Sequence, residues 1–301
     1  MKRVALTALG LSMMVTGAAS AADMAVKAPP IAVAPPCIWC GFYVGLNAGY
    51  AWSDNSVSSV GNGVQIEPLL SPTIPPAAAA SVTGPVPAGR SDGFIGGAQA
   101  GYNFQSRNFV FGVETDIQGL SGRGSGTVSN SVIWSPPSSV NSTLTASNKV
   151  EWLGTLRGRA GLTIAPNFLV YGTAGLAYGQ VNSSVAITQQ VVGIGGVPAG
   201  GAAALVSSLA SASETRVGWA AGAGGEWMLS GNWSAKLEYL HYDLGGVNYN
   251  GAVNNFATVG APVPVGTPIY TVNTRNSTNF RGDIVRVGLN YKLGGPVVAK
   301  Y

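Results

Sequence analysis

The sequence predicts an all-β protein: a transmembrane barrel of eight antiparallel strands connected up and down, with three short periplasmic turns and four long extracellular loops. Three observations support this prediction. Eight segments alternate apolar and polar residues, short and long connections alternate between them, and an export signal precedes a chain in which only 9% of residues are charged. A period of two is typical of strands whose two faces meet different surroundings.

The first 22 residues have the pattern of a cleaved secretory signal peptide. Lys2 and Arg3 form a basic start, Val4 to Val15 an apolar stretch, and Ala19 to Ala21 a cleavage site. Without Lys2 and Arg3, 14 basic residues face 12 acidic ones, a net charge of about +2. The mature chain is therefore near neutral, and its charge predicts no binding to nucleic acid.

Composition and hydropathy favour a membrane protein that crosses with strands. The chain has 43 glycines and a mean hydropathy of +0.26, which is unusual for a soluble protein. A spanning helix needs about 20 consecutive apolar residues. The nearest candidate, Val181 to Ser213, is interrupted by glycines and Pro198, so a helix across a membrane is disfavoured.

Residues 23–40 are expected to form a Pro/Ala-rich periplasmic linker that ends in Cys37-Ile38-Trp39-Cys40. A C-x-x-C pattern can be a redox pair, half of a metal site or a local disulfide. Neither a thioredoxin-like setting nor two further zinc ligands accompany it. In an exported protein, a local disulfide or two free thiols is favoured for Cys37 and Cys40.

The first four strands share an apolar face opposite a face of glycine, amide and charged residues. In the first, every second residue from Phe42 to Trp52 is apolar, and in the third, Phe111 and Val113 alternate with Gly112 and Glu114. These strands are expected at Phe42–Trp52, Gly93–Gln105, Phe109–Gln118 and Lys149–Ile164.

The last four strands repeat this design. The final one alternates most regularly, because Val285, Val287, Leu289, Tyr291 and Leu293 are separated by polar or small residues. These strands are expected at Asn167–Gly179, Arg216–Leu229, Asn232–Leu244 and Asn279–Leu293. The barrel therefore covers residues 41–293, with a short tail at 294–301.

The connections indicate which ends of the strands lie together. Three links have the composition of tight hairpin turns: Ser106-Arg107-Asn108, Ala165-Pro166-Asn167 and Ser230-Gly231-Asn232. The others are long and are expected as loops: Ser53–Asp92, Ser121–Asn148, Gln180–Thr215 and Gly245–Thr278. In a meander, this alternation places all tight turns at one end, as in outer-membrane barrels. The prolines of the first loop are expected to prevent a sheet there and to leave it mobile.

The membrane explains why such a sheet must close. Lipid cannot hydrogen-bond to the backbone groups of an open strand edge, so a sheet within the membrane closes into a barrel. An even number of strands permits this closure in an antiparallel sheet. Aromatic residues near strand ends suit the two membrane interfaces. These residues are Phe42, Tyr50, Trp52, Phe104, Phe109, Phe168, Tyr178, Trp227, Trp233, Tyr239 and Tyr291.

Charged residues of the polar face predict the contents of the lumen. Four are acidic and five basic: Glu114, Asp116, Glu226 and Glu238, with Arg157, Arg159, Lys236, Arg286 and Lys292. An eight-stranded barrel is narrow enough for side chains to fill it, so an ion-pair network that plugs the lumen is expected. The alternative is a narrow porin-like pathway whose selectivity these charges set, with glycines of the same face leaving gaps.

Three motifs carry a resemblance to a known family. Trp39 to Gly45, Trp233 to Tyr239 and Val285 to Tyr291 are similar to segments of the alphaproteobacterial RopB-type outer membrane proteins, which are small OmpA-like barrels and abundant surface antigens. The similarity extends over the whole chain. It implies a structural, envelope-stabilising and surface-presenting protein in the outer membrane, with outer-membrane lipids, lipopolysaccharide and the barrel-assembly machinery as partners. The chain departs from the pattern at Cys40 and in ending beyond Leu293 with a tail.

The sequence bears on two further functions, lipid modification and binding by the loops. Small barrels of this size include enzymes that modify lipid A acyl chains with a serine and a histidine. The one histidine, His241, has Asp243 and not serine as its same-face neighbour, so no enzyme is predicted and no catalytic, cofactor or metal residues are assigned. The loops could bind host molecules, phage or haem, but the sequence offers no ligand set for haem. Loop ligands and oligomeric state are not readable from the sequence.

Overall fold

A computed structural model of the chain describes residues 37–66, 74–136, 138–192, 205–256, 266 and 268–293. The expected signal peptide, the linker as far as residue 36 and the tail at 294–301 lie outside the described residues.

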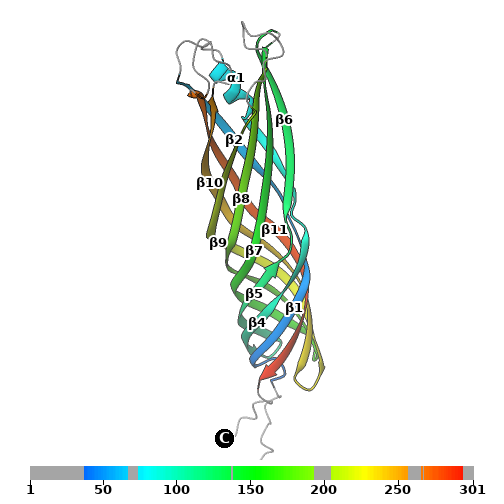
Figure 1. Cartoon of the computed structure of the whole chain (residues 1–301). Coiled ribbons are helices and arrows are strands. Elements are labelled where there is room, and N and C mark those ends of the chain that lie inside the picture. The colour runs from blue at the N-terminus through cyan, green and yellow to red at the C-terminus, as the bar shows by residue number, and fades with distance from the viewer. Residues whose placement is uncertain are drawn as a thin grey trace, which may run out of the picture. The chain divides into compact units, whose positions relative to one another are not determined.

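The described residues form one antiparallel sheet of eleven strands and a single short helix (Figure 1). The strands are β1 (Gly41–Trp52), β2 (Asp54–Gln65), β3 (Gly84–Arg90), β4 (Gly93–Ser106), β5 (Phe109–Leu120), β6 (Gly124–Ser135), β7 (Ser138–Ala165), β8 (Phe168–Val192), β9 (Leu205–Ser230), β10 (Trp233–Phe256) and β11 (Pro268–Leu293); the helix is α1 (Ile74–Ser81). The sheet closes on itself because β1 pairs with both β4 and β11, with Tyr50 opposite Val285 in the latter pair.

Eight strands were expected, and the described sheet has three more because β2, β3 and β6 lie in segments that the sequence assigned to loops. The ring that closes runs β1-β4-β5-β7-β8-β9-β10-β11 and returns to β1. Tight turns join β4 to β5, β7 to β8 and β9 to β10, and each leaves two residues between strands. The first and third turns contain Arg107 and Gly231 with positive φ, which suits hairpin turns.

The polarity of the sheet's two faces reverses along the strands. From Phe168 to Tyr178, the apolar series of β8 points outward, whereas Val181, Val185 and Ile187 further along the same strand are buried inside. We call the portion with an apolar exterior the barrel part (residues 41–52, 93–120, 152–179, 217–243 and 283–293). The portion with an apolar interior is the sandwich part (residues 54–65, 74–90, 124–150, 180–192, 205–216, 246–256 and 268–281).

The sandwich part consists of two sheets packed face to face. One contains β10, β11, β2 and β3, and the other contains β6, β7, β8 and β9. Pairing of β9 with β10 stops at Trp219 and Asp243, and among the described residues no ladder joins β3 to β6. Buried apolar residues from both sheets form one core, which indicates that water surrounds this part.

The loop prediction for residues 53–92 was therefore wrong. Pro85 and Pro87 belong to β3, which pairs with β2 and, among the described residues, with no other strand. An edge strand tolerates proline because one side of it needs no backbone donor. Pro75 and Pro76 lie in the first turn of α1, where the missing N–H has no helical acceptor. Long parts of the other three expected loops are likewise strand, since β6 to β11 extend into them.

Helix α1 closes the interior of the sandwich part at the end opposite the β4–β5 turn (Figure 1). Ala77, Ala78 and Ala79 are buried, and a Cβ at Gly61 of β2 would lie 2.6 Å from the carbonyl oxygen of Ala79. The Gln189 amide donates to the carbonyl of Ala78 at 3.0 Å. No helix in the described residues has the length and apolar character needed to cross a membrane.

Candidate functional site

The outer surface of the barrel part is an apolar band with aromatic contacts at both margins. At the end with the tight turns, Phe42 meets Tyr102 and Trp233 meets Tyr291, with ring centroids 4.6 and 5.0 Å apart. At the other margin, Tyr50 meets Phe94 and Trp152 meets Tyr178, at 5.6 and 6.0 Å. Between the margins, large apolar side chains such as Leu46 are exposed. This distribution matches the hydrocarbon and the two interfaces of a bilayer.

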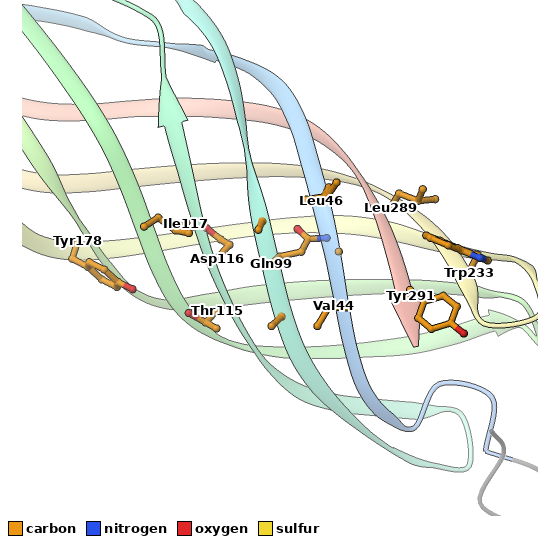
Figure 2. A pocket seen from close by; sticks show the side chains of 13 residues that line it. Val44, Leu46, Gln99, Thr115, Asp116, Ile117, Tyr178, Trp233, Leu289 and Tyr291 are labelled. Carbon is orange, nitrogen blue, oxygen red and sulfur yellow. The ribbon is translucent and has the colours of Figure 1, made fainter. Parts of the chain in front are cut away.

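A hollow of about 750 Å³ lies on this band and is shown in Figure 2. Small residues Ala98 and Ala100 of β4 line it and lie opposite Leu46 and Val44 of β1. Tyr178 and Tyr291 lie at its two ends (Figure 2). Because the hollow lies between the two aromatic margins, lipid hydrocarbon is the medium that contacts it.

The lumen of the barrel part contains a buried ion network centred on Arg157. The Arg157 guanidinium donates to Glu114 Oε1 at 2.8 Å, to Asp116 Oδ2 at 2.7 Å and to Glu238 Oε1 at 3.1 Å. Its side chain is 0% exposed, as are those of Asp116 and Glu238. One planar cation thus holds three carboxylates from β5 and β10 through the fixed fork of N–H donors that a guanidinium presents.

Arg286 and Lys236 complete the centre of the network. Arg286 donates through Nε to Glu238 at 2.7 Å and through Nη2 to Asp116 at 2.9 Å. The Lys236 ammonium lies 2.7 and 2.9 Å from the two oxygens of Glu114. Buried carboxylates are stable only when they are paired and hydrogen-bonded in this way. The contacts connect strands on opposite sides of the ring and so fasten the barrel across its lumen.

A second group of contacts lies nearer the tight turns and is built around Arg159. Arg159 Nη2 donates to Glu226 Oε2 at 2.7 Å, and the guanidinium carbon lies 4.0 Å from the centre of the Tyr171 ring. Glu226 also accepts from Ser234 at 2.6 Å and from Asn290 at 2.8 Å. Tyr43 joins the two groups because its hydroxyl donates to Glu114 at 2.7 Å and accepts from Arg159 at 3.1 Å.

Glycines of the inner face make room for these long side chains. A Cβ at Gly224 would lie 2.7 Å from the Tyr171 hydroxyl, and one at Gly288 would lie 2.9 Å from the Gln99 amide. The sequence allowed such glycines to leave gaps in the lumen. In the structure, neighbouring side chains occupy the space above these two glycines.

The lumen at the turn end is closed by the Cys37–Cys40 segment. A disulfide joins Cys37 to Cys40, and Trp39 between them is 3% exposed. Trp39 packs in a small apolar cluster with Val110, Leu169, Tyr171 and Met228. The Trp39 backbone N–H donates to Gln105 Oε1 at 3.2 Å.

Lys292 belongs to this closure and not to the central network. Its ammonium donates to the backbone carbonyl of Ile38 at 2.7 Å. The other eight lumen residues selected from the sequence do come together, and they are four cations facing four carboxylates. Four acids and five bases were expected in the lumen network, and without Lys292 the network has equal numbers of each. Lys292 instead anchors the segment that carries Trp39.

His241 lies on the outer surface at the margin next to the sandwich part. Its Nδ1 is 2.8 Å from Asp283 Oδ1, and the same oxygen accepts from the Tyr239 hydroxyl at 2.6 Å. The Trp219 ring centre is 5.4 Å from that of His241. Sequence reasoning missed Asp283 because it lies 42 residues away, on β11, and only strand pairing places it opposite His241.

Several lumen residues were also missed as members of the network. Gln118 accepts from Arg286 at 3.0 Å, and Tyr171 donates to Glu238 at 3.2 Å. Their inward position in the alternation was the available signal, since Tyr43 and Tyr171 occupy the polar face of their strands. Uncharged side chains on that face were not counted as candidates.

These features define the class of the protein. A closed antiparallel sheet with an apolar exterior, aromatic margins and a charged, buried interior is a membrane β-barrel. Residues 11–293 match the family described as "Outer membrane protein beta-barrel domain", and the chain belongs to this family. It is therefore an integral protein of the outer membrane.

Relatives from Brucella and Rhizobium agree with this assignment. The chain is 35% identical to the 31 kDa outer-membrane immunogenic protein of Brucella melitensis over 298 residues, which cover 97% of this chain and 100% of that protein. Identity to the 22 kDa outer membrane protein of Rhizobium leguminosarum bv. viciae is 32%, covering 52% and 56% of the two chains. These relatives confirm the resemblance to alphaproteobacterial outer membrane proteins. The outer membrane protein OprG from Pseudomonas aeruginosa has a TM-score of 0.39 at 12% identity, covering 85% of this chain and 97% of that one.

Proposed function

We propose that the protein has a structural and surface-presenting role: it anchors in the outer membrane through eight strands and holds the sandwich part outside the cell. The eight strands are those of the closed ring, whose apolar band lies between the two aromatic margins. Strands β2, β3 and β6 and helix α1 belong to the sandwich part. Relatives named as outer-membrane immunogenic proteins in Brucella support a surface-exposed antigen.

The observation that carries the structural role is the buried ion network, in which the numbers of cations and carboxylates are equal. Four cations and four carboxylates occupy the lumen with side chains that are at most 4% exposed where they pair. Trp39 closes the same lumen at the turn end. A filled lumen supports an envelope-stabilising protein better than a porin-like channel, which needs a hydrated path.

Conductance tests this proposal directly. The refolded mature chain in planar lipid bilayers is expected to give no stable conductance steps. Large, long-lived steps would contradict a closed lumen and favour the channel. Migration in gels before and after boiling serves as the control for folding, because a closed barrel resists detergent until it is heated.

Surface labelling tests the orientation. In a Cys37→Ser/Cys40→Ser background, Ser129→Cys places a thiol on the exposed face of β6, and Asn108→Cys places one in the exposed β4–β5 turn. A membrane-impermeant maleimide added to whole cells is expected to label residue 129 and to reach residue 108 only after the outer membrane is permeabilised. The reverse pattern would refute the proposed orientation.

We further propose that the protein is not a lipid-modifying enzyme. The His241 ring nitrogen bonds to Asp283, and within the described residues no serine, threonine or cysteine hydrogen-bonds to it. An activated nucleophile needs such a contact. The cluster of His241, Tyr239 and Trp219 suits an anchor at the outer-leaflet interface, where lipopolysaccharide is the neighbouring lipid.

A further inference from the structure

The core of the sandwich part contains a layer of polar side chains that lies between its two sheets. In one sheet, Asn148 of β7 is opposite Ser183 of β8. In the facing sheet, Asn276 of β11 lies between its register partners, Ser59 of β2 and Tyr249 of β10. All five side chains are buried, and we call them the polar layer. Each of their donors and acceptors therefore needs a partner inside the protein.

Direct hydrogen bonds across the core satisfy part of the polar layer. Asn148 donates through Nδ2 to Thr278 Oγ1 of β11 at 3.1 Å, and the hydroxyl groups of Ser183 and Tyr249 lie 2.9 Å apart. Thr278 and Asn276 are alternate residues of β11 and share its inner face. The first of these bonds therefore brings the Asn148 amide close to the level of Asn276.

Three oxygen atoms of the polar layer have no hydrogen-bonding partner among the described residues. They are Asn148 Oδ1, Asn276 Oδ1 and Ser59 Oγ, and the three residues are 1, 0 and 0% exposed. A buried polar atom without a partner retains the full cost of its removal from water, so such atoms are uncommon in folded proteins. Three of them in one layer indicate a site for a ligand that bonds to all three.

The strand geometry brings these three atoms to one level of the core. Ser59 and Asn276 are direct cross-strand partners, whose Cβ atoms are about 5 Å apart. The Asn276 Nδ2 atom donates to Thr274 Oγ1 at 3.4 Å, so its Oδ1 faces away from Thr274. It faces the level at which the Asn148 amide contacts Thr278.

We propose that the polar layer binds one buried water molecule, which joins the two sheets. The two amide oxygens accept hydrogen bonds and the serine hydroxyl donates one, so the ligand must offer two donors and one acceptor. Water meets this requirement by donating to Asn148 Oδ1 and Asn276 Oδ1 and by accepting from Ser59. Three hydrogen bonds are typical of a buried water molecule. The site goes beyond the proposed structural role and does not depend on orientation in the membrane.

A metal cation is the competing ligand for three oxygen atoms. None of the side chains of the polar layer carries a charge that would compensate a cation, and an uncompensated charge is far more costly to bury than water. Hard divalent cations also take about six or more oxygen ligands, twice the number that is unpaired here. The chemistry of the polar layer therefore favours water.

A crystal structure of the mature protein, at a resolution that shows ordered water, tests occupancy directly. One density peak is expected at hydrogen-bonding distance, about 2.6–3.2 Å, from all three oxygen atoms. Parallel crystals are soaked in rubidium chloride and in manganese chloride, because the anomalous signal of either ion would mark a cation site. The absence of a peak between the three oxygens, or an anomalous peak there, would overturn the proposal.

Stability in solution distinguishes a hydrated polar layer from a dry one by the sign of the change. Ser59→Ala removes one partner of the water, so the urea midpoint in detergent micelles is expected to fall by about 0.5 M. In a dry layer, the same substitution removes an unpaired buried hydroxyl, and the midpoint would rise or stay the same. The matched control is Ser58→Ala on the exposed face of the same strand, which should leave the midpoint unchanged.

A double variant tests whether one molecule serves both sheet partners. The loss in Ser59→Ala/Asn276→Leu is expected to be smaller than the sum of the two single losses, because both residues bond to the same water. Strictly additive losses would assign the two residues to separate sites and overturn a single shared water. Heat-modifiable migration is checked for each variant, so that only folded proteins are compared.

Discussion

The loss in free energy of unfolding when Arg157 is replaced would show whether the lumen is dry. Arg157→Met keeps much of the side-chain volume but leaves three cations against the four carboxylates of the network. Loss of one partner from a buried ion pair costs about 3–5 kcal/mol, because the remaining charge stays in a poor solvent. In a water-filled lumen, the same loss would cost about 0–1 kcal/mol. The contacts of Arg157 and its 0% exposed side chain predict the larger value.

Urea unfolding in detergent micelles, followed by tryptophan fluorescence, is the assay. A loss of about 4 kcal/mol at a slope of about 2 kcal/mol per molar urea lowers the midpoint by about 2 M. The control is Arg275→Met on the exposed outer face of β11, for which a change within about 0.5 kcal/mol is expected. Arg157→Met/Asp116→Asn leaves three cations facing three carboxylates in the network. This double variant should recover part of the lost stability, because the two substituted residues are in contact and their effects are coupled.

One result would refute the reasoning about a dry lumen. If Arg157→Met unfolds at the same urea concentration as Arg275→Met, with an unchanged slope, the network charges are solvated. A porin-like path would then be the better account of the lumen.

Three further predictions concern other regions. Trp39→Ala should lower stability by about 3–5 kcal/mol without creating conductance, since the ion network remains; a new conductance would place the seal at Trp39. His241→Ala and Asp283→Asn should leave the lipid A acyl pattern unchanged by mass spectrometry, and an altered pattern would favour the enzyme. Burial raises the pKa of Tyr270, so the unfolded chain ionises first above about pH 10 and stability falls there. Tyr270→Phe should reduce that fall, as measured by urea midpoints at pH 8 and 11, and buried tyrosines such as Tyr249, whose pKa is also raised by burial, account for the rest; an equal fall in both proteins would exclude a contribution from Tyr270.

The membrane-facing design could be predicted from the sequence because it is local. In Val285–Leu293, side chains two residues apart must share a face of any strand, so the apolar set is readable without knowing a partner. The three tight turns are equally local, since a few turn residues suffice to reverse a strand. The same alternation predicted that the charged residues lie in the lumen, because they occupy the strand face opposite the apolar one.

Only the tertiary structure decided what lies beyond the membrane and which charges meet. In β8, the apolar series changes from Leu176 and Tyr178 outside to Val185 and Ile187 inside, within a segment whose continuation from Gln180 was predicted as a loop. The reversal has a physical reason: where water replaces lipid around the strands, the apolar face must turn inward to form a core. Likewise, Arg157 and Glu238 are 81 residues apart and meet only because the closed ring brings β7 and β10 across one lumen. Alternation determines the face of each residue, but the partner depends on strand register and closure, which local sequence does not specify.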